Sequence, residues 1–523
     1  MQNPSLLVVL YGILYWIISH LVCVVMTFRI KQLVFAVCLS AAALSAAAAD
    51  YLVVVPVKGK RGPGPNIQVS LNAAPLPAAK VGTAYTYDMK SLLLVTGDPS
   101  LDLTKSTWAA VNASQLPAGL TLASNGVLSG TPTLMNEAGA SFEVVSTYKS
   151  KSGRQVYTIV VNGVALQVVQ LSAGDDHTCA VTPAGGVKCW GLNDYGQLGT
   201  GTQDNKSTPV DVLGLTSGVA SVWAGGQHTC ALTTAGGLKC WGRNSYGQLG
   251  NGSMSAVKAS PVAVQGLASG VAMVRTGWAH TCAVTSAGGL KCWGRDNYGQ
   301  LGDSAALTNM SAPVDVLGLT AGVASVGLGA NHSCAVTTAG AVKCWGQNSV
   351  GQLGNNTYTN KPTPADVVGL TSGVKSVEGG FVHTCAVTTA GGVKCWGDHS
   401  VGQLGTGQPL VESLVPVDVP GVTGGVASLS AGDSHNCVAT TAGRVKCWGS
   451  NDMGQLGIAG APVVQPDPLD VPGLQGVSAV DAGWGHSCAV VASSAKCWGF
   501  NDYGQLGNNS TTSSPTPINV LPQ

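Results

Sequence analysis

Histidine and cysteine recur at a fixed spacing through the C-terminal part of the sequence. A histidine stands two residues before a cysteine, and a second cysteine follows nine or ten residues later, in seven successive copies. These side chains bind zinc, and histidine is the side chain most often used for general acid–base catalysis. The histidines are His177, His228, His280, His332, His383, His435 and His486. The cysteine pairs are Cys179 with Cys189, Cys230 with Cys240, Cys282 with Cys292, Cys334 with Cys344, Cys385 with Cys395, Cys437 with Cys447, and Cys488 with Cys497.

Repetition argues against both kinds of chemistry. Each copy offers three ligands, whereas a structural zinc site takes four. A catalytic residue is needed once in a molecule, but a residue that maintains the fold is needed in every repeat. We therefore predict that the histidines are structural, that the seven cysteine pairs form disulfides, and that the protein binds no metal or other cofactor.

Short strands bring each pair of cysteines together. Residues 177–181 and 187–191 are typical of β-strands, and the turn between them carries the glycine that hairpin loops favour. If this turn centres on Ala184, residues whose numbers sum to 368 face each other, so Cys179 faces Cys189. Directly opposed residues lie about 4.5–5.5 Å apart, which a disulfide can bridge.

The seventh copy tests this register, because its loop is one residue shorter. Cys488 and Cys497 still pair if the turn tightens to the two residues Ala492 and Ser493. In the first copy, strand alternation places cysteine and valine on one face and alanine and tryptophan on the other. Both faces are apolar, so we expect both to be covered by neighbouring sheets.

The whole unit repeats every 51 or 52 residues. A strand such as Val-Ala-Ser-Val-Trp-Ala-Gly at residues 219–225 precedes the histidine, and a strand such as Pro-Val-Asp-Val at residues 209–212 follows the Gly-Gln-Leu-Gly segment. Four strands in each of seven units predict an all-β protein with a seven-bladed β-propeller, which leaves only short sheet edges. We expect the last strand, residues 517–520, to complete the first blade and so close the ring.

The repeated sequence pattern resembles that of a known family. The pattern His-Thr-Cys-Ala-Val, Gly-Gly-Val-Lys-Cys-Trp-Gly and Gly-Gln-Leu-Gly is similar to the regulator of chromosome condensation repeat, and the likeness covers roughly residues 166–523. The resemblance implies a seven-bladed propeller. The cysteine pair departs from the eukaryotic form of the repeat and indicates a secreted, bacterial-type variant.

Function is expected where the repeats differ. The two residues before each histidine vary, and they occupy one structural position, so they should ring one end of the propeller. Among them we predict Trp278, Phe381, Trp484, Asp175 and Asp176 as binding residues, because aromatic side chains dominate interaction hot spots. The alternative is that these aromatic rings pack against neighbouring loops.

The chain before the repeats divides into three segments. Residues 1–49 are predicted to be a signal peptide or a membrane segment, with Met26 as the true start in the first case. Residues 50–66 are a linker by composition. Residues 67–164 are predicted to be a β-sandwich with Trp108 in its core, and they resemble the immunoglobulin-like modules of bacterial surface proteins. Residues 165–523 are the predicted propeller.

Composition limits the class of partner. Charged residues make up 10% of the chain and the net charge is +1, so no basic stripe is available for nucleic acid. We predict a monomeric binding protein, secreted or at the cell surface with the periplasm also possible, that binds a protein or glycan and meets a membrane only through an N-terminal anchor. We do not expect an enzyme. The alternatives are a polysaccharide lyase or hydrolase that uses Asp175, Asp176 or Asp433 at the central channel, and a structural surface component.

Overall fold

The computed structural model describes residues 66–133, 136–163, 165–304 and 307–522. The predicted signal or membrane segment at residues 1–49, including Met26, lies outside the described residues, as do residues 50–65 of the predicted linker. Among the described residues, helical structure is confined to three single-turn 3₁₀ helices, and none could cross a membrane. They are η1 (Met89–Leu92), η2 (Leu103–Lys105) and η3 (Ala113–Gln115).

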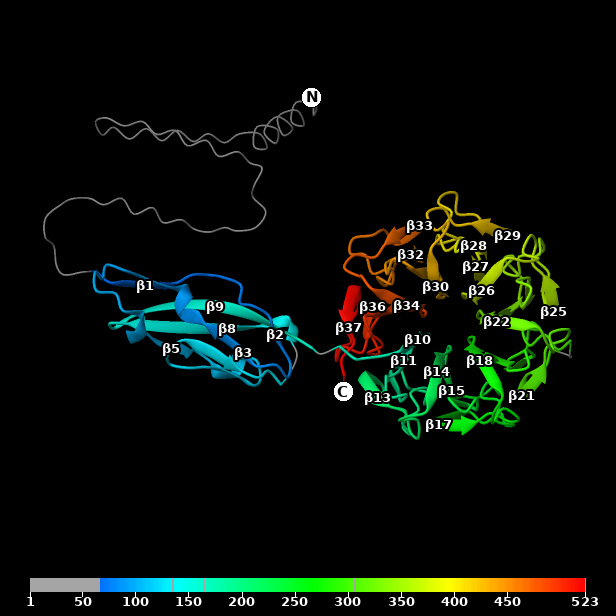
Figure 1. The fold of residues 1–523 in the computed structure, drawn as a ribbon, viewed down its shortest axis with the longest axis horizontal. Coiled ribbons are helices and arrows are strands. Elements are labelled where there is room, and N and C mark those ends of the chain that lie inside the picture. The colour runs from blue at the N-terminus through cyan, green and yellow to red at the C-terminus, as the bar shows by residue number, and fades with distance from the viewer. Residues whose placement is uncertain (1–65, 134–135, 164, 305–306, 523) are drawn as a thin grey trace, which may run out of the picture. The chain divides into compact units, whose positions relative to one another are not determined.

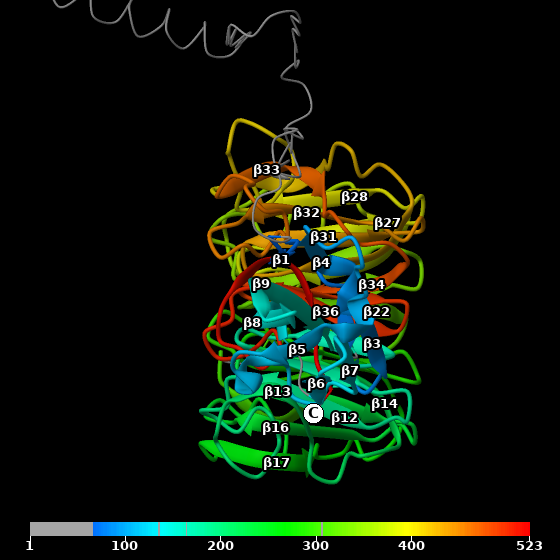
Figure 2. The ribbon, with the colours of Figure 1, turned by 90° about the vertical axis from the view of Figure 1, so that its left-hand side faces the viewer.

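Residues 68–162 form nine strands in three small sheets, with strand orders β2-β9-β8-β5, β3-β7-β6 and β1-β4. Strands β9, β8 and β5 lie side by side (Figure 2). The strands are β1 (Gln68–Leu71), β2 (Ala79–Lys80), β3 (Tyr85–Asp88), β4 (Leu93–Thr96), β5 (Thr107–Ala110), β6 (Leu120–Leu122), β7 (Val127–Gly130), β8 (Asn136–Tyr148) and β9 (Lys151–Asn162).

One core holds this unit together. Trp108 lies in it with 4% of its surface exposed, which confirms the prediction for this residue. Gly126 packs on the tryptophan ring, and a Cβ atom there would lie 2.8 Å from Trp108 Nε1. The Asn-Gly turn at residues 125–126 therefore needs glycine both for this contact and for its φ of +86°.

The remaining strands form seven four-stranded antiparallel sheets around a ring (Figure 1). The innermost strand of each sheet faces the axis. In chain order the blades are β10 (Gln170–Ala173), β11 (His177–Val181), β12 (Val187–Gly191), β13 (Lys206–Asp211); β14 (Val219–Ala224), β15 (His228–Thr233), β16 (Leu238–Arg243), β17 (Val257–Ala263); β18 (Val271–Thr276), β19 (His280–Thr285), β20 (Leu290–Gly294), β21 (Met310–Asp315); β22 (Val323–Leu328), β23 (His332–Thr337), β24 (Val342–Gly346), β25 (Lys361–Asp366); β26 (Val374–Gly379), β27 (His383–Thr388), β28 (Val393–Gly397), β29 (Ser413–Asp418); β30 (Val426–Ala431), β31 (His435–Thr440), β32 (Val445–Ser450), β33 (Val464–Asp470); and β34 (Val477–Ala482), β35 (His486–Val491), β36 (Ser494–Gly499), β37 (Ser514–Asn519).

The predicted hairpin register is confirmed. Cys179 faces Cys189 across β11 and β12, and the same register holds in the next five blades. In the seventh blade Val491 faces Ser494, so the turn tightens to Ala492 and Ser493 as expected.

The predicted disulfides are confirmed in every blade. The two Cα atoms of each pair lie 4.0 to 4.2 Å apart, slightly closer than expected from the sequence for directly opposed residues. The bonds join Cys179 to Cys189, Cys230 to Cys240, Cys282 to Cys292, Cys334 to Cys344, Cys385 to Cys395, Cys437 to Cys447, and Cys488 to Cys497.

Each blade packs on the next through its two apolar faces. The cluster between the first two blades joins Cys179 and Val187 of one sheet to Ala231 and Trp241 of the next. The indole Nε1 of Trp241 also donates to the carbonyl of Gln197, at 2.8 Å. Both faces of each sheet are therefore covered, as the sequence pattern predicted, and the disulfides lie inside the cores between blades.

The prediction for ring closure is wrong. The last strand, β37, pairs with β36 of the seventh blade and does not enter the first blade. Residues 165–168 close the ring instead, because Leu166 N–H donates to Val520 O and Leu166 O accepts from Ala495 N–H. Leu215, in the segment that connects the first blade to the second, makes the same two backbone hydrogen bonds with the first blade. Leu166 therefore does for the seventh blade what the connecting segment does for the first.

Removing one disulfide should weaken the ring without unfolding it. We expect the double variant Cys282→Ala with Cys292→Ala to lower the free energy of unfolding by about 2 kcal/mol, since a disulfide that closes a short loop restricts the unfolded chain only modestly. Guanidinium unfolding followed by tryptophan fluorescence measures the change. The wild type, kept oxidised, is the reference, and a double variant as stable as the wild type would contradict the expectation.

Candidate binding site

Each repeated histidine is bonded to the next blade. His177 Nε2 lies 2.8 Å from Thr229 Oγ1, and that hydroxyl donates to the carbonyl of Gln197. Because the hydroxyl proton goes to the carbonyl, the imidazole donates from Nε2 and its Nδ1 carries no proton. Equivalent contacts join all seven blades, and His486 completes the circle by bonding Thr178.

Burial keeps these histidines neutral. All seven are fully buried, and their Nδ1 atoms have no hydrogen-bond partner. Desolvation lowers the pKa of His177, His228 and His280 to about 3. A protonated ring would be a buried cation whose second N–H had no acceptor. The arrangement therefore holds blades together and offers no proton donor at neutral pH.

Several of the residues that vary before the histidines come together at one end of the propeller axis. Asp175, Asp176, Trp278, Phe381 and Trp484 line one hollow of about 360 Å³. Asp433, Phe500 and Tyr503 complete its wall. We call this hollow the mouth. The structure thus places all five predicted binding residues around one space, and it adds a third carboxyl and two more aromatic rings.

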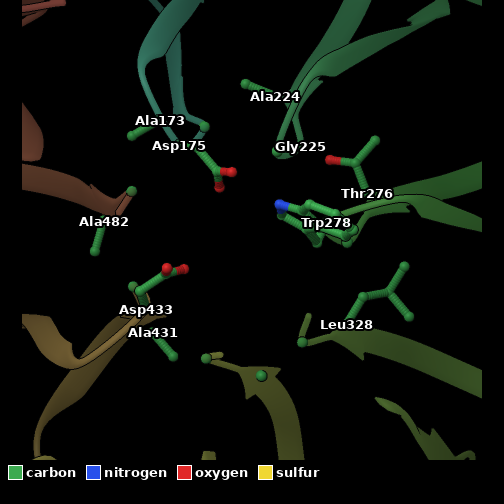
Figure 3. A pocket seen from close by; sticks show the side chains of 18 of the residues that line it. Ala173, Asp175, Ala224, Gly225, Thr276, Trp278, Leu328, Ala431, Asp433 and Ala482 are labelled. Atoms are coloured by element: carbon green, nitrogen blue, oxygen red, sulfur yellow. The ribbon is translucent and has the colours of Figure 1, made fainter. Parts of the chain in front are cut away.

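Three side chains of the mouth point into the space on the axis (Figure 3). Asp175 follows β10, Trp278 follows β18 and Asp433 follows β30. The indole nitrogen of Trp278 faces the Asp175 carboxylate (Figure 3) and slightly opposes the rise in its pKa. Trp484 packs edge-on against Phe500 with ring centroids 5.4 Å apart, yet Trp484 and Phe381 remain 40% and 41% exposed. The aromatic rings therefore contact their neighbours and still face solvent.

Crowding raises the pKa values of the mouth carboxyls. Burial, followed by repulsion from Asp433 and Asp176, holds the pKa of Asp175 well above its usual range. Burial and the charge of Asp176 raise the pKa of Asp433 to about 7. Burial and the charge of Asp502 raise the pKa of Asp176 to about 6. A cation that approaches such carboxyls stabilises their charged form.

The channel below the mouth contains charged residues that sequence reasoning missed. The variable position of the Val-Ala-Ser-Val-x-Ala-Gly strand faces the axis and holds Trp223, Arg275, Glu378 and Asp481. Arg275 stacks on Trp223 at 3.7 Å and forms an ion pair with Glu378 at 3.5 Å. Burial raises the pKa of Asp481 to about 7. Variation at one position of a repeated strand was the signal that could have found them.

A line of stacked cations and rings extends from the mouth across neighbouring blades. Arg295 lies 5.3 Å from the ring of Trp278 and 5.4 Å from that of Tyr246. Arg243 lies between Tyr246 and Tyr195, at 5.5 and 5.0 Å. No sequence spacing indicated that these arginines would join the tyrosines of neighbouring blades. Within the described ranges, no cluster of three histidine, cysteine, aspartate or glutamate residues could hold a metal.

Family models match both parts of the described chain. An Ig domain model matches residues 68–162, and two models of the regulator of chromosome condensation (RCC1) repeat match residues 184–232 and residues 168–197 and 219–248. An RCC1-like domain model matches residues 258–523, which is half of the chain. The chain belongs to the RCC1 repeat family. The predicted fold class, a seven-bladed propeller preceded by an immunoglobulin-like domain, is confirmed.

Curated relatives in the family include the ultraviolet-B receptor UVR8 of Arabidopsis thaliana, which is 34% identical over 300 residues and covers 56% of this chain and 67% of its own. The human E3 ubiquitin-protein ligase HERC2 is 32% identical over 333 residues, or 62% of this chain. This chain spans only 7% of HERC2.

Solved structures show the same architecture. Human WBSCR16 is 25% identical with a TM-score of 0.55, covering 64% of this chain and 88% of that one. Yeast RCC1 (Prp20), solved with Kap60 bound, is 23% identical with a TM-score of 0.58, covering 68% and 85%. At this identity the yeast protein shares the fold alone.

Proposed function

We propose that this protein is exported and binds a protein or a glycan through the mouth of its propeller. The exposed rings of Phe381 and Trp484 beside the carboxyls of Asp175 and Asp433 carry the proposal. Aromatic side chains at the centre of a polar hollow supply most of the energy of many interfaces. The backbone at Trp484 is also held in place, because its N–H contacts Gly174 O at 3.4 Å. Binding there would therefore cost little conformational entropy.

The proposed location rests on the cysteines and the chain order. Disulfides form and persist in oxidising compartments, and this propeller has seven. In this proposal residues 1–49 direct export or anchor the chain, and residues 50–66 act as a tether. Residues 67–164 space the propeller from the surface. The RCC1 relatives support a binding role without naming the partner.

Truncating the aromatic rim tests the proposal. We expect the triple variant Trp278→Ala, Phe381→Ala, Trp484→Ala to lose at least tenfold in affinity for whatever the wild type binds on arrays of glycans and peptides, because large apolar contacts are removed. The matched control replaces exposed apolar residues outside the mouth, with Leu213→Ala, Leu317→Ala and Val368→Ala. Equal signals from wild type and rim variant would place the contact elsewhere and overturn the proposal.

A second candidate function is favoured by one observation. Asp175 and Asp433 converge on the axis, and the pKa of Asp433 is raised to about 7, as a general acid needs. Two carboxyls across a cleft are the usual machinery of glycoside hydrolysis. Release of reducing ends from a panel of polysaccharides by the wild type, abolished in Asp433→Asn, would establish the enzyme. A wild type with no release on the whole panel would leave the binding function alone.

A further inference from the structure

The carboxyls of the mouth have no cationic partner among the described residues. The aspartates that do form ion pairs lie elsewhere, on the outer strands and in the sandwich. Arg275 lines the channel with Asp175 and Asp433, but it is paired with Glu378. Arg243 and Arg295 are stacked on aromatic rings and directed to Gln227 and Asn331. Asp175, Asp176 and Asp433 therefore have no cationic partner in the described chain, and they carry unpaired negative charge at the axis once the pH exceeds their raised pKa values.

Aromatic rings surround this charge. Trp278, Phe381 and Trp484 stand around the carboxyls, and Phe500 and Tyr503 extend the wall with ring centroids 6.1 Å apart. The face of an aromatic ring attracts a cation, and the attraction grows when the cation loses water. An aromatic wall around unpaired carboxyls is therefore suited to a positively charged group with an apolar stem.

The space on the axis is narrow. The channel below the mouth has a volume of about 100 Å³ and is bounded by glycine backbones of all seven inner strands. Its floor is crossed by the Arg275–Glu378 ion pair and the hydrogen bond from Ser430 to Asp481. The floor residues Arg275, Glu378 and Asp481 stand three positions before mouth residues, about 10 Å deeper along a strand. The channel suits one slender side chain better than a sugar ring.

We propose that the mouth binds a lysine or arginine side chain of a protein partner, with its cation between Asp175 and Asp433 and its stem against Trp278, Phe381 and Trp484. This inference rests on the proposed binding function and names the chemistry of its partner. The carboxyls then have the counter-charge that the described chain does not supply, and the rings cover the methylene groups of the stem.

The experiment uses the full oxidised chain at pH 8, above the pKa of about 7 of Asp433. The probes are arrayed 12-residue peptides that are identical except for a central Lys, Arg, Gln or Glu, together with amine-bearing chitosan oligomers. The test variant, Asp175→Asn with Asp433→Asn, keeps the side-chain shapes. The matched control, Asp366→Asn with Asp418→Asn, removes the same charge from outer strands, where these carboxylates are exposed beside Lys343 and Lys394.

We expect the wild type and the control to prefer Lys and Arg peptides over the Gln peptide at least tenfold, and the test variant to lose this preference. No preference for basic peptides in the wild type overturns the inference, as does a preference that the test variant retains. Chitosan binding without peptide binding also overturns it, in favour of a cationic glycan. If the aromatic rim variant loses a ligand that the Asp175→Asn, Asp433→Asn variant still binds, the binding function stands and only the cation inference fails.

Discussion

Replacing Gly225 by alanine is expected to lower the free energy of unfolding by about 3 kcal/mol or more. Gly225 directly follows β14, the inner strand of the second blade, and a Cβ atom there would lie 2.6 Å from the carbonyl oxygen of Gly277 and 2.8 Å from His228 Cε1. Neither neighbour can move freely. The carbonyl contacts Gly226 N–H, and the imidazole is bonded to Thr281 of the next blade.

The control for this effect is another glycine of the same propeller. At Gly424 a Cβ atom would have one neighbour, the carbonyl of Ala390 at 3.8 Å, so Gly424→Ala should be neutral or slightly stabilising. Guanidinium unfolding followed by tryptophan fluorescence compares the two variants with the wild type. Similar stabilities for Gly225→Ala and Gly424→Ala would show that the inner ring of glycines is not tightly packed.

The sequence predicted contacts within one hairpin and missed contacts between blades. The hairpin register follows from alternation and loop length within a few residues, so Cys179 could be paired with Cys189, and the tight turn at Ala492 and Ser493 could be placed. The glycine that follows the inner strand of each blade is explained by its contact with the next blade, about one repeat away in the sequence, and nothing local reveals that contact.

Ring geometry accounts for the other differences. The expected closure by the last strand failed because Leu166, which precedes the first strand of the first blade, mimics a connector rather than a strand. Asp433 was visible in the sequence as a single-copy carboxyl, but its approach to Asp175 depends on closing seven blades around one axis. Arg275 and Glu378 meet across the channel from the third and fifth blades, and no sequence spacing encodes that meeting.

The third blade carries a buried carboxylate at a position where five other blades have an asparagine and the fifth blade has His399. Two residues after most Trp-Gly pairs, an asparagine side chain is hydrogen-bonded to the backbone of the following loop. Asn348 accepts from Leu353 N–H with its oxygen and donates from Nδ2 to the carbonyls of Thr357 and Thr359. In the third blade this position is Asp296, whose Oδ1 accepts from Leu301 N–H at 2.9 Å while the buried Oδ2 has no partner. A carboxylate has no proton to donate.

Asp296→Asn should therefore stabilise the protein at pH 8, by up to about 3 kcal/mol. Burial, together with the nearby charge of Asp303, raises the pKa of Asp296 to about 6 from its usual 3.8. A carboxyl whose pKa is raised by folding opposes folding once it is ionised in both states. The loss of folding free energy caused by ionised Asp296 is largest above pH 6. It decreases as the pH falls towards 4, because Asp296 is then protonated in the folded protein.

The stabilisation by Asp296→Asn should accordingly shrink between pH 6 and pH 4, which unfolding curves at pH 8, 6 and 4.5 would measure. The reverse change in the next blade, Asn348→Asp, is the matched control. It should lose stability at pH 8, because two carbonyls lose their donor, and recover part of it in acid when the new carboxyl takes up a proton. If Asp296→Asn changed the free energy of unfolding equally at all three pH values, ionisation of Asp296 would not be the cause of the change.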